Sequence, residues 1–260
     1  MNLIEAVLLG LVQGFTEWLP ISSSGHLVIA HYLLDISFSP DFDIALMLGT
    51  CIALALFFRK KIFWLFFGIL RLEKKQWDYL KLIIVAGIPT AIIGFALKDF
   101  FKSFFSQPLL VSLFIILTGV FLLFVSSKKN LQNSNQNKLS FKGAFFIGLA
   151  QGLAVMPGIS RSGSTIGSAM LFGLSAEDAA EFSFLIGLPA MLIASLVEFA
   201  GAYSKTIAVD ILFAGIITSL VAGYISIAFL MSLLKKNKLH WFGYYCVLAG
   251  VVFISLILFK

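Results

Sequence analysis

The chain has 260 residues, of which 60% are hydrophobic and 12% charged, and its mean hydropathy is +1.00. Soluble domains are about 45–50% apolar and about 25% charged, so the composition predicts a polytopic membrane protein. The net charge of +6 does not indicate a nucleic-acid partner, because the basic residues lie in short loops between apolar runs and no soluble domain carries them.

Near the N-terminus, a polar motif interrupts apolar sequence. QGFTEWLPISSSGH, residues 13–26, places a carboxylate, three serines, a glycine and a histidine next to the apolar runs 2–15 and 25–34. Each run is shorter than the roughly 20 residues that cross a bilayer, and irregular backbone is tolerated at membrane depth only inside protein or beside a wet cavity. We therefore predict a re-entrant helical hairpin over residues 2–34. The first residues lack a basic flank, so no cleaved signal peptide is expected.

Six later stretches have the length and apolarity of a membrane span. They lie at approximately 42–58, 79–98, 108–126, 179–201, 208–234 and 241–259. Between the third and the fourth, two short apolar runs flank MPGISRSGSTI, which predicts a second hairpin over residues 141–174. The polar segment 128–140 has no apolar period and is predicted to be a cytoplasmic linker.

The two hairpins belong to an internal repeat. At an offset of 138 residues, eight of the seventeen positions in residues 10–26 are identical to those in 148–164. Each half, 1–127 and 141–260, then has one hairpin and three spans, and because three is odd the second half enters the membrane inverted. The predicted fold is an all-α polytopic membrane protein with an inverted-topology repeat, each half one re-entrant helical hairpin plus three transmembrane helices.

Two glycine pairs recur at the same positions of the repeat. Gly10 and Gly14 lie on one face of the first half-helix, and Gly148 and Gly152 lie on one face of its counterpart. Small residues at this spacing let helices approach closely in lipid. We therefore expect each pair to pack against another helix.

The basic residues indicate an orientation, because cytoplasmic loops are enriched in Lys and Arg. Segment 59–81 holds seven of them, 128–142 holds four and 235–238 holds three. These three segments alternate correctly to share the cytoplasmic side. Both termini are then predicted on the outer, periplasmic side.

The two hairpin tips have the composition of an anion site. A half-helix that begins inside the membrane directs its first N–H groups and a partial positive charge toward the break. The tips supply hydroxyls, glycines that allow backbone approach, and one guanidinium that can hold phosphate through two bonds. These residues are Ser22, Ser23, Ser24 and Gly25 in the first tip, and Ser160, Arg161, Ser162, Gly163 and Thr165 in the second. We expect the tips to meet and enclose one pocket.

Glu17 adds an acid to this predicted pocket. A carboxylate, an arginine and several hydroxyls together are typical of phosphoryl transfer. Gln13 lies one helical turn before Glu17, so the two side chains could bind a divalent cation, Mg²⁺ or Ca²⁺, and Glu17 could instead act as general base. Ser23 is a candidate nucleophile with His26 as its base. A water molecule activated by Glu17 is the alternative, and the residues do not choose between them.

A transporter or lipid flippase is the competing function. Inverted repeats with helices broken at the midplane are the architecture of alternating access. The asymmetry of the repeat favours an enzyme, because one copy carries Glu17 and His26 where the other carries Val155 and Ser164. The two activities could also coexist in one molecule.

QGFTEWLPISSSGHL resembles the first signature of the undecaprenyl-diphosphate phosphatase (bacitracin-resistance) family, and MPGISRSGSTI resembles its second. EFSFLIGLPA, residues 181–190, is similar to a further segment of that family. The resemblance covers nearly the whole chain. It implies a hydrolase of the bacterial cytoplasmic membrane that removes the terminal phosphate of a polyprenyl diphosphate and so recycles the lipid carrier of cell-wall synthesis.

The resemblance also implies residue roles. Gln13 and Glu17 match positions associated with the divalent cation and catalysis, and many relatives carry Glu in place of Gln13. Ser23 and His26 match the hydroxyl and the imidazole implicated in the chemistry. The diphosphate would be held by Ser160, Arg161, Ser162 and Thr165. Activity is expected at the outer face, while a monomer and a homodimer both stay open.

Overall fold

The computed structural model describes residues 1–36, 40–128, 139–202 and 207–260, and its regular elements are all α-helices. The helices are α1 (Leu3–Glu17), α2 (Ser23–Leu34), α3 (Pro40–Phe57), α4 (Arg59–Leu70), α5 (Lys74–Ala96), α6 (Lys98–Lys102), α7 (Pro108–Ser127), α9 (Phe141–Leu153), α10 (Arg161–Leu171), α11 (Ala176–Ala202), α12 (Val209–Leu234) and α13 (His240–Phe259). The predicted all-α class is confirmed. Most of the predicted linker, residues 129–138, lies outside the described residues.

The helices form a multi-pass membrane protein. Five of them, α5, α7, α11, α12 and α13, are long and apolar enough to cross a membrane. The first predicted span is a bent pair instead, because α3 and α4 meet at an angle of 75° on either side of Phe58. This pair brings the number of candidate spans to six when it is counted as one, in agreement with the prediction.

Each predicted hairpin is a pair of short helices with a break between them. The break after α1 ends at Ser22, which has a positive φ of 72° and accepts a hydrogen bond from Gly25 N at 3.3 Å. The break after α9 ends at Ser160, which accepts from Gly163 N at 3.0 Å. A serine N-cap of this kind satisfies one of the free N–H groups of a helix start. Both second half-helices therefore begin at the hairpin tip.

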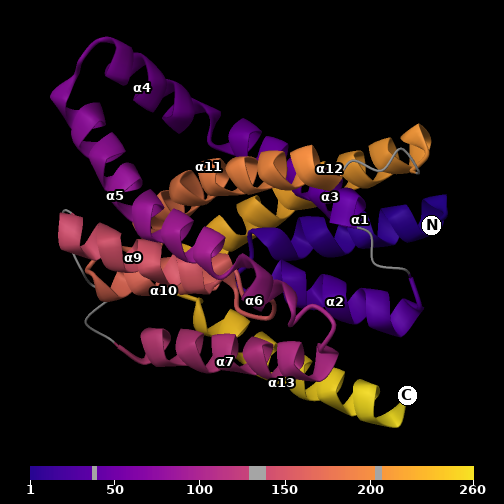
Figure 1. Ribbon diagram of the computed structural model, residues 1–260. Coiled ribbons are helices and arrows are strands. Elements are labelled where there is room, and N and C mark those ends of the chain that lie inside the picture. Colours follow the sequence, from indigo (N-terminus) through magenta and orange to yellow (C-terminus); the bar gives the residue numbers. More distant parts are fainter. Residues whose placement is uncertain (37–39, 129–138, 203–206) are drawn as a thin grey trace.

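The two hairpins enter the helix bundle from opposite ends (Figure 1). The α1–α2 hairpin starts at the end that carries both termini, and the α9–α10 hairpin starts at the opposite end. Their tips meet in the interior, where Trp18 is fully buried and packs edge-on against Phe184 of α11 at 5.2 Å between ring centroids. The interior of the bundle thus holds both breaks.

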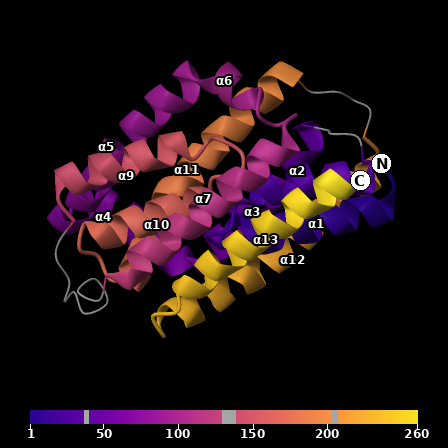
Figure 2. The same ribbon diagram turned by 90° about the horizontal axis from the view of Figure 1, so that it is seen from below.

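The glycine pairs pack as expected. A Cβ atom added to Gly14 would lie 2.5 Å from Ala222 Cβ of α12, and one added to Gly152 would lie 2.8 Å from Ile93 Cβ of α5. Helix α1 thus packs on α12, and its repeat counterpart α9 packs on α5, the counterpart of α12. Helices α7 and α13, the last of each half, lie side by side (Figure 2). Two halves related by a twofold axis would pair their helices in this way. That the halves cross a membrane in opposite directions stays a prediction.

The two ends of the bundle differ in charge. At one end Lys260 Nζ lies 2.8 Å from Asp35 Oδ1, so the C-terminus is close to the end of α2. Lys61 and Lys235 both pair with acids in the first turns of α11. The basic segments around α4 and after α12 therefore share one end, as predicted. Which end faces the cytoplasm stays a prediction.

Candidate active site

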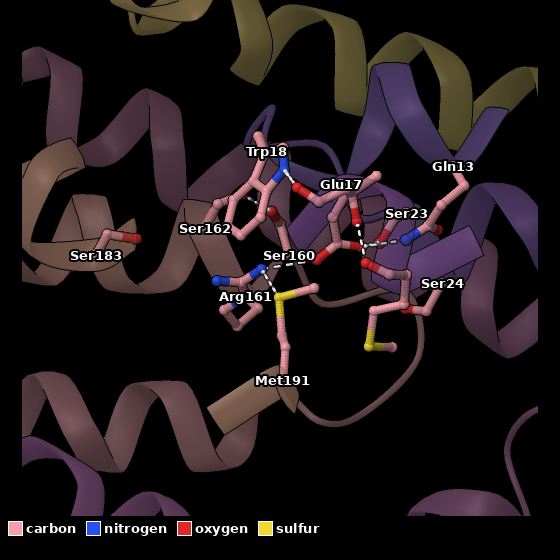
Figure 3. Close-up of polar contacts among 12 residues, drawn as sticks. Gln13, Glu17, Trp18, Ser23, Ser24, Ser160, Arg161, Ser162, Ser183 and Met191 are labelled. Carbon is pink, nitrogen blue, oxygen red and sulfur yellow. Dashed lines mark hydrogen bonds and ion pairs between the residues drawn. The ribbon is translucent and has the colours of Figure 1, made fainter. Parts of the chain in front are cut away.

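Glu17, the last residue of α1, is the centre of a buried polar cluster (Figure 3). Its Oε1 accepts a hydrogen bond from Arg161 Nη2 at 2.7 Å. Its Oε2 accepts from Ser23 Oγ at 2.6 Å and from Gln13 Nε2 at 2.9 Å. The Glu17 side chain is 9% exposed and that of Arg161 is 15% exposed. The predicted meeting of the guanidinium with the acid and its neighbouring hydroxyl is confirmed.

The local sequence explains how these side chains converge. Gln13 and Glu17 are four residues apart, so they lie on the same face of α1. Ser23 is the first residue of α2, and Arg161 is the first residue of α10. Two helix N-termini therefore lie beside one carboxylate, and the partial positive charge at a helix start favours an anion.

The hairpin tips touch each other directly. Ser162 Oγ of the second tip donates to the Leu19 carbonyl of the first at 2.9 Å. A Cβ atom added to Gly25 would lie 3.1 Å from Gly158 Cα, so the glycine allows the two backbones to approach closely. Gly158 itself has a φ of +93°, a conformation that favours glycine. Two segments far apart in the chain are thus in direct contact at their tips, and the pocket expected between them stays a prediction.

The other hydroxyls of the tips contact one another or backbone atoms. Ser22 Oγ lies 3.4 Å from Ser24 Oγ, and Ser160 Oγ lies 3.2 Å from Ser162 Oγ. Thr165 Oγ1 donates to the first carbonyl of α10 at 2.8 Å. These hydroxyls shape the tips and border the cluster, whereas Ser23 is the one predicted tip hydroxyl that bonds directly to Glu17 among the described contacts.

Three further residues hold the Arg161 side chain. Its guanidinium lies over the Trp18 ring, 4.8 Å from the centroid, and such a cation–π contact favours the charged group. Nη2 also contacts Met191 Sδ at 2.8 Å. A Cβ atom added to Gly187 of α11 would overlap Nη1, so the guanidinium occupies the space that the glycine leaves. Nη1 is buried and has no hydrogen-bond partner in the described part of the chain.

His26 does not join the Glu17 cluster. Its Nε2 lies 2.9 Å from Tyr245 Oη of α13, and its Nδ1 lies 2.8 Å from the Ser22 carbonyl. Its ring also stacks on Tyr245, with 5.7 Å between the centroids. The expected pair of Ser23 with His26 as its base is therefore not formed, because both ring nitrogens have other partners and the Ser23 hydroxyl donates to Glu17.

A divalent cation would find few protein ligands at this site. Among the described residues, no group of three or more His, Cys, Asp or Glu side chains is arranged to hold a metal. The cluster offers one carboxylate from Glu17, with the Gln13 amide and the Ser23 hydroxyl beside it. Mg²⁺ is commonly bound by one or two carboxylates plus phosphate oxygens of a substrate. The residues thus fit a cation that arrives with a phosphate, and Gln13, which now directs Nε2 at Glu17, would have to turn its amide to ligate it.

The sequence reasoning missed Trp18, Gly187, Met191 and Tyr245 as neighbours of the site. Gly187 carried a usable signal, because it matches Gly49 at the repeat offset of 138 and lies in the family-like segment 181–190. Met191 and Tyr245 have no comparable signal, since both are ordinary apolar or aromatic residues of spanning helices. Their roles depend on how α11 and α13 pack against the tips.

The fold and the site together define a class of protein, a multi-pass helical membrane protein in which two hairpin tips hold a buried carboxylate, a hydroxyl and a guanidinium in mutual contact. The family model described as bacitracin resistance protein BacA matches residues 6–252, and the chain belongs to this family.

Curated relatives agree with the family over nearly the full length. The chain is 39% identical to an undecaprenyl-diphosphatase of Carboxydothermus hydrogenoformans over 263 residues, which cover 98% of each protein. It is 40% identical to one of Syntrophotalea carbinolica, covering 98% of this chain and 99% of the relative. A third relative of the same name, from Treponema denticola, is 40% identical and covers 96% of each.

Proposed function

We propose that the chain hydrolyses undecaprenyl diphosphate, a long polyprenyl diphosphate, to undecaprenyl phosphate and inorganic phosphate. The observation that carries this proposal is the buried contact of Glu17 with Arg161 and Ser23 between two helix N-termini. The names of the curated relatives support the substrate. The apolar surroundings of the site suit a substrate whose prenyl tail stays in the bilayer.

Arg161 is the proposed phosphate ligand. Its Nη1 is buried without a partner, and an unpaired donor of this kind is costly unless a ligand uses it. A diphosphate would also compete with Glu17 for Nη2, because both are anions that a guanidinium binds well. Binding would therefore separate the Glu17–Arg161 ion pair, in which the two charges compensate each other. The freed carboxylate can then accept a proton.

Glu17 is the proposed general base in either of two routes. In the first, Ser23 Oγ gives its proton to Glu17 and attacks the terminal phosphorus. The bond to the bridging oxygen breaks, undecaprenyl phosphate leaves, and water later hydrolyses the phosphoserine. In the second, Glu17 accepts a proton from water, which attacks the same phosphorus. The 2.6 Å contact between Ser23 Oγ and Glu17 Oε2 favours the first route.

We also propose that a divalent cation, Mg²⁺ or Ca²⁺, accompanies the diphosphate. Glu17 and Gln13 would supply protein oxygen ligands, and the cation would neutralise charge on the reacting phosphates. Glu17, Gln13, Ser23 and Arg161 of the described chain are the residues that would surround the cation and the diphosphate. Activity at the outer face would require that the pocket open toward the end that carries both termini.

Phosphate release in detergent micelles tests the proposal, because a micelle has no second compartment for transport. Purified protein with added Mg²⁺ or Ca²⁺ should release inorganic phosphate from a prenyl diphosphate. Glu17→Gln and Arg161→Ala should each abolish release, while Glu181→Gln should retain it because Glu181 pairs with Lys61 instead. A wild-type protein that moves the lipid across vesicles without releasing phosphate would support the flippase. Wild-type turnover in Glu17→Gln would contradict the proposed base.

Two further measurements complete this test. Ser23→Ala should lose release completely if Ser23 is the nucleophile, and should keep a reduced rate if water attacks and Ser23 only donates a hydrogen bond. Removing one partner of a buried ion pair costs about 3–5 kcal/mol, because the other charge is left uncompensated. Each inactive variant must therefore also be monodisperse on a sizing column before its loss of activity is assigned to chemistry.

A further inference from the structure

A basic arm extends from the bundle away from the active site. We define the arm as residues 59–81, which comprise α4 and the first turns of α5 and diverge from the other helices (Figure 1). It contains seven Lys or Arg residues against two acids, Glu73 and Asp78. Two of its cations already form ion pairs. Lys61 pairs with an acid of α11 at 2.6 Å, and Lys81 pairs with Asp78 at 3.2 Å. The remaining cations leave the arm with a positive charge excess.

The two helices of the arm line an open cavity of about 270 Å³. Two cations, Lys60 and Arg71, line this cavity, and no salt bridge of either is found among the described residues. One acid, Glu73, lies at the same cavity. The two cations exceed the single carboxylate by one positive charge, which favours an anionic occupant.

The apolar wall of the cavity faces outward. Phe63 and Phe67, which line it, are 57% and 50% exposed, and their rings lie 6.1 Å apart. Trp64 completes this wall and receives the Lys61 ammonium over its ring at 4.6 Å. In a membrane protein, half-exposed aromatic side chains at the end of the bundle contact lipid, and tryptophan favours the headgroup level. An occupant of this cavity would therefore have an apolar part beside its anion.

Gln76 gives the cavity a neutral polar group. It lines the cavity, is only 3% exposed, and its Oε1 has no hydrogen-bond partner in the described part of the chain. Its side chain is held against Gly68, where an added Cβ would overlap it. A buried acceptor without a donor is unfavourable. A hydroxyl group on the occupant would supply the missing donor.

We infer that this cavity binds an anionic phospholipid whose headgroup carries a free hydroxyl, of the phosphatidylglycerol type. Lys60 and Arg71 contact the phosphate, Gln76 accepts from the hydroxyl, and the acyl chains lie along Phe63 and Phe67. Basic pockets beside membrane helices are a recurrent form of lipid headgroup site. The site is separate from the Glu17 cluster, so lipid binding does not depend on the proposed hydrolysis.

Native mass spectrometry of the detergent-solubilised protein tests this inference. The wild type, exposed to equal amounts of phosphatidylglycerol and phosphatidylcholine, should retain one phosphatidylglycerol. Lys60→Ala/Arg71→Ala should bind it about thirtyfold more weakly, given the usual contribution of two basic residues near a membrane surface. Lys74→Ala/Lys236→Ala is the matched control, since it removes the same charge from positions outside the cavity, and it should bind like the wild type.

Three outcomes would overturn the inference. Equal retention of phosphatidylcholine would show that the cavity does not select an anion. Equal loss in the control variant would assign binding to overall surface charge. Displacement of the lipid by the same concentration of soluble glycerol phosphate would assign the cavity to a free phosphate compound. As a check on the hydroxyl, Gln76→Met should lower the preference for phosphatidylglycerol over phosphatidic acid, and an unchanged preference would contradict the role of Gln76.

Discussion

The Glu17 carboxylate accepts hydrogen bonds from three side chains, and each comes from a different part of the chain. Gln13 precedes it by one helical turn, Ser23 follows it across the break, and Arg161 arrives from the other half of the chain. All three donate hydrogen bonds to the carboxylate. Three donors thus hold the carboxylate in one orientation, with its Oε2 next to the Ser23 hydroxyl.

Gly187 is predicted to position Arg161 for the proposed reaction. An added methyl group would overlap Nη1 and displace the guanidinium. Because a shift of about 1 Å at a reacting centre can cost about a hundredfold in rate, Gly187→Ala should lower kcat/KM for phosphate release by about that factor. Arg161→Lys has no Nη1, so in that background Gly187→Ala should change kcat/KM by less than about threefold. Equal losses in both backgrounds would contradict the positioning role.

Gly49 provides the matched control for this cycle. It occupies the repeat position of Gly187, and a Cβ atom there would overlap Ser219 of α12 instead of Arg161. Gly49→Ala should therefore lower Tm, with an effect on activity that adds to that of Arg161→Lys. If Gly187→Ala acts only by destabilising the fold, it should likewise lower Tm and have an activity effect that adds to that of Arg161→Lys. If it displaces the guanidinium, the two activity effects should not add.

The structure separates His26 from the proposed proton transfer. Because His26 contacts Tyr245 and the Ser22 carbonyl, we expect it to support the strained turn at Ser22. His26→Gln keeps polar atoms for these contacts and should retain measurable phosphate release, at least about tenfold above Glu17→Gln, since a general base contributes about 10²–10⁴-fold. Rates measured side by side on the same substrate check this. If His26→Gln and Glu17→Gln are both well folded and equally inactive, the imidazole takes part in the reaction and this prediction is wrong.

At the scale of helices, the repeat is built on close glycine contacts. Gly14 brings α1 against α12, and Gly152 brings α9 against α5. These contacts fix where each first half-helix ends and therefore where its tip lies. Without a hydrophobic driving force between helices in lipid, such close packing is a main source of association.

Gly148→Ala tests this packing. A Cβ atom at Gly148 would overlap the Ala86 backbone of α5, whereas one at Gly87, on the same α5, has nothing within 4 Å. We expect Gly148→Ala to destabilise the protein by about 1–3 kcal/mol through overpacking. Gly87→Ala should leave stability unchanged or raise it by up to about 1 kcal/mol through helix propensity. Thermal unfolding in one detergent compares them, and a Gly148→Ala variant as stable as Gly87→Ala would argue against the tight α5–α9 contact.

At the scale of the whole molecule, the charge asymmetry predicts the orientation. A cysteine at the exposed position Lys236, in the basic segment after α12, should react with an impermeant thiol reagent only after the membrane is opened. A cysteine at the exposed position Ser106, before α7, should react in intact cells. Cys51 and Cys246 are buried, so the unmodified chain supplies the background. The reverse labelling pattern would invert the assigned orientation.

Much of the site was accessible from the sequence because its residue types are rare in membrane segments. Glu17 and Arg161 are charged groups in apolar surroundings, which are expensive unless they are paired or functional. The two glycine pairs were likewise visible from their spacing. His26 was the expectation that the structure changed, because a histidine three residues after a serine lies near it along the helix, yet its side chain can point to another helix.

The sequence by itself determined the membrane class, the two hairpins and the charged pair, because hydropathy, chain length and a 138-residue repeat are properties of the linear chain. Only the tertiary structure decided which atoms meet. The contact of Ser23 with Glu17 and not with His26, the space that Gly187 leaves for Arg161, and the cavity of the basic arm all depend on side-chain direction and helix packing. These are set by contacts between residues far apart in the chain, which no local pattern records.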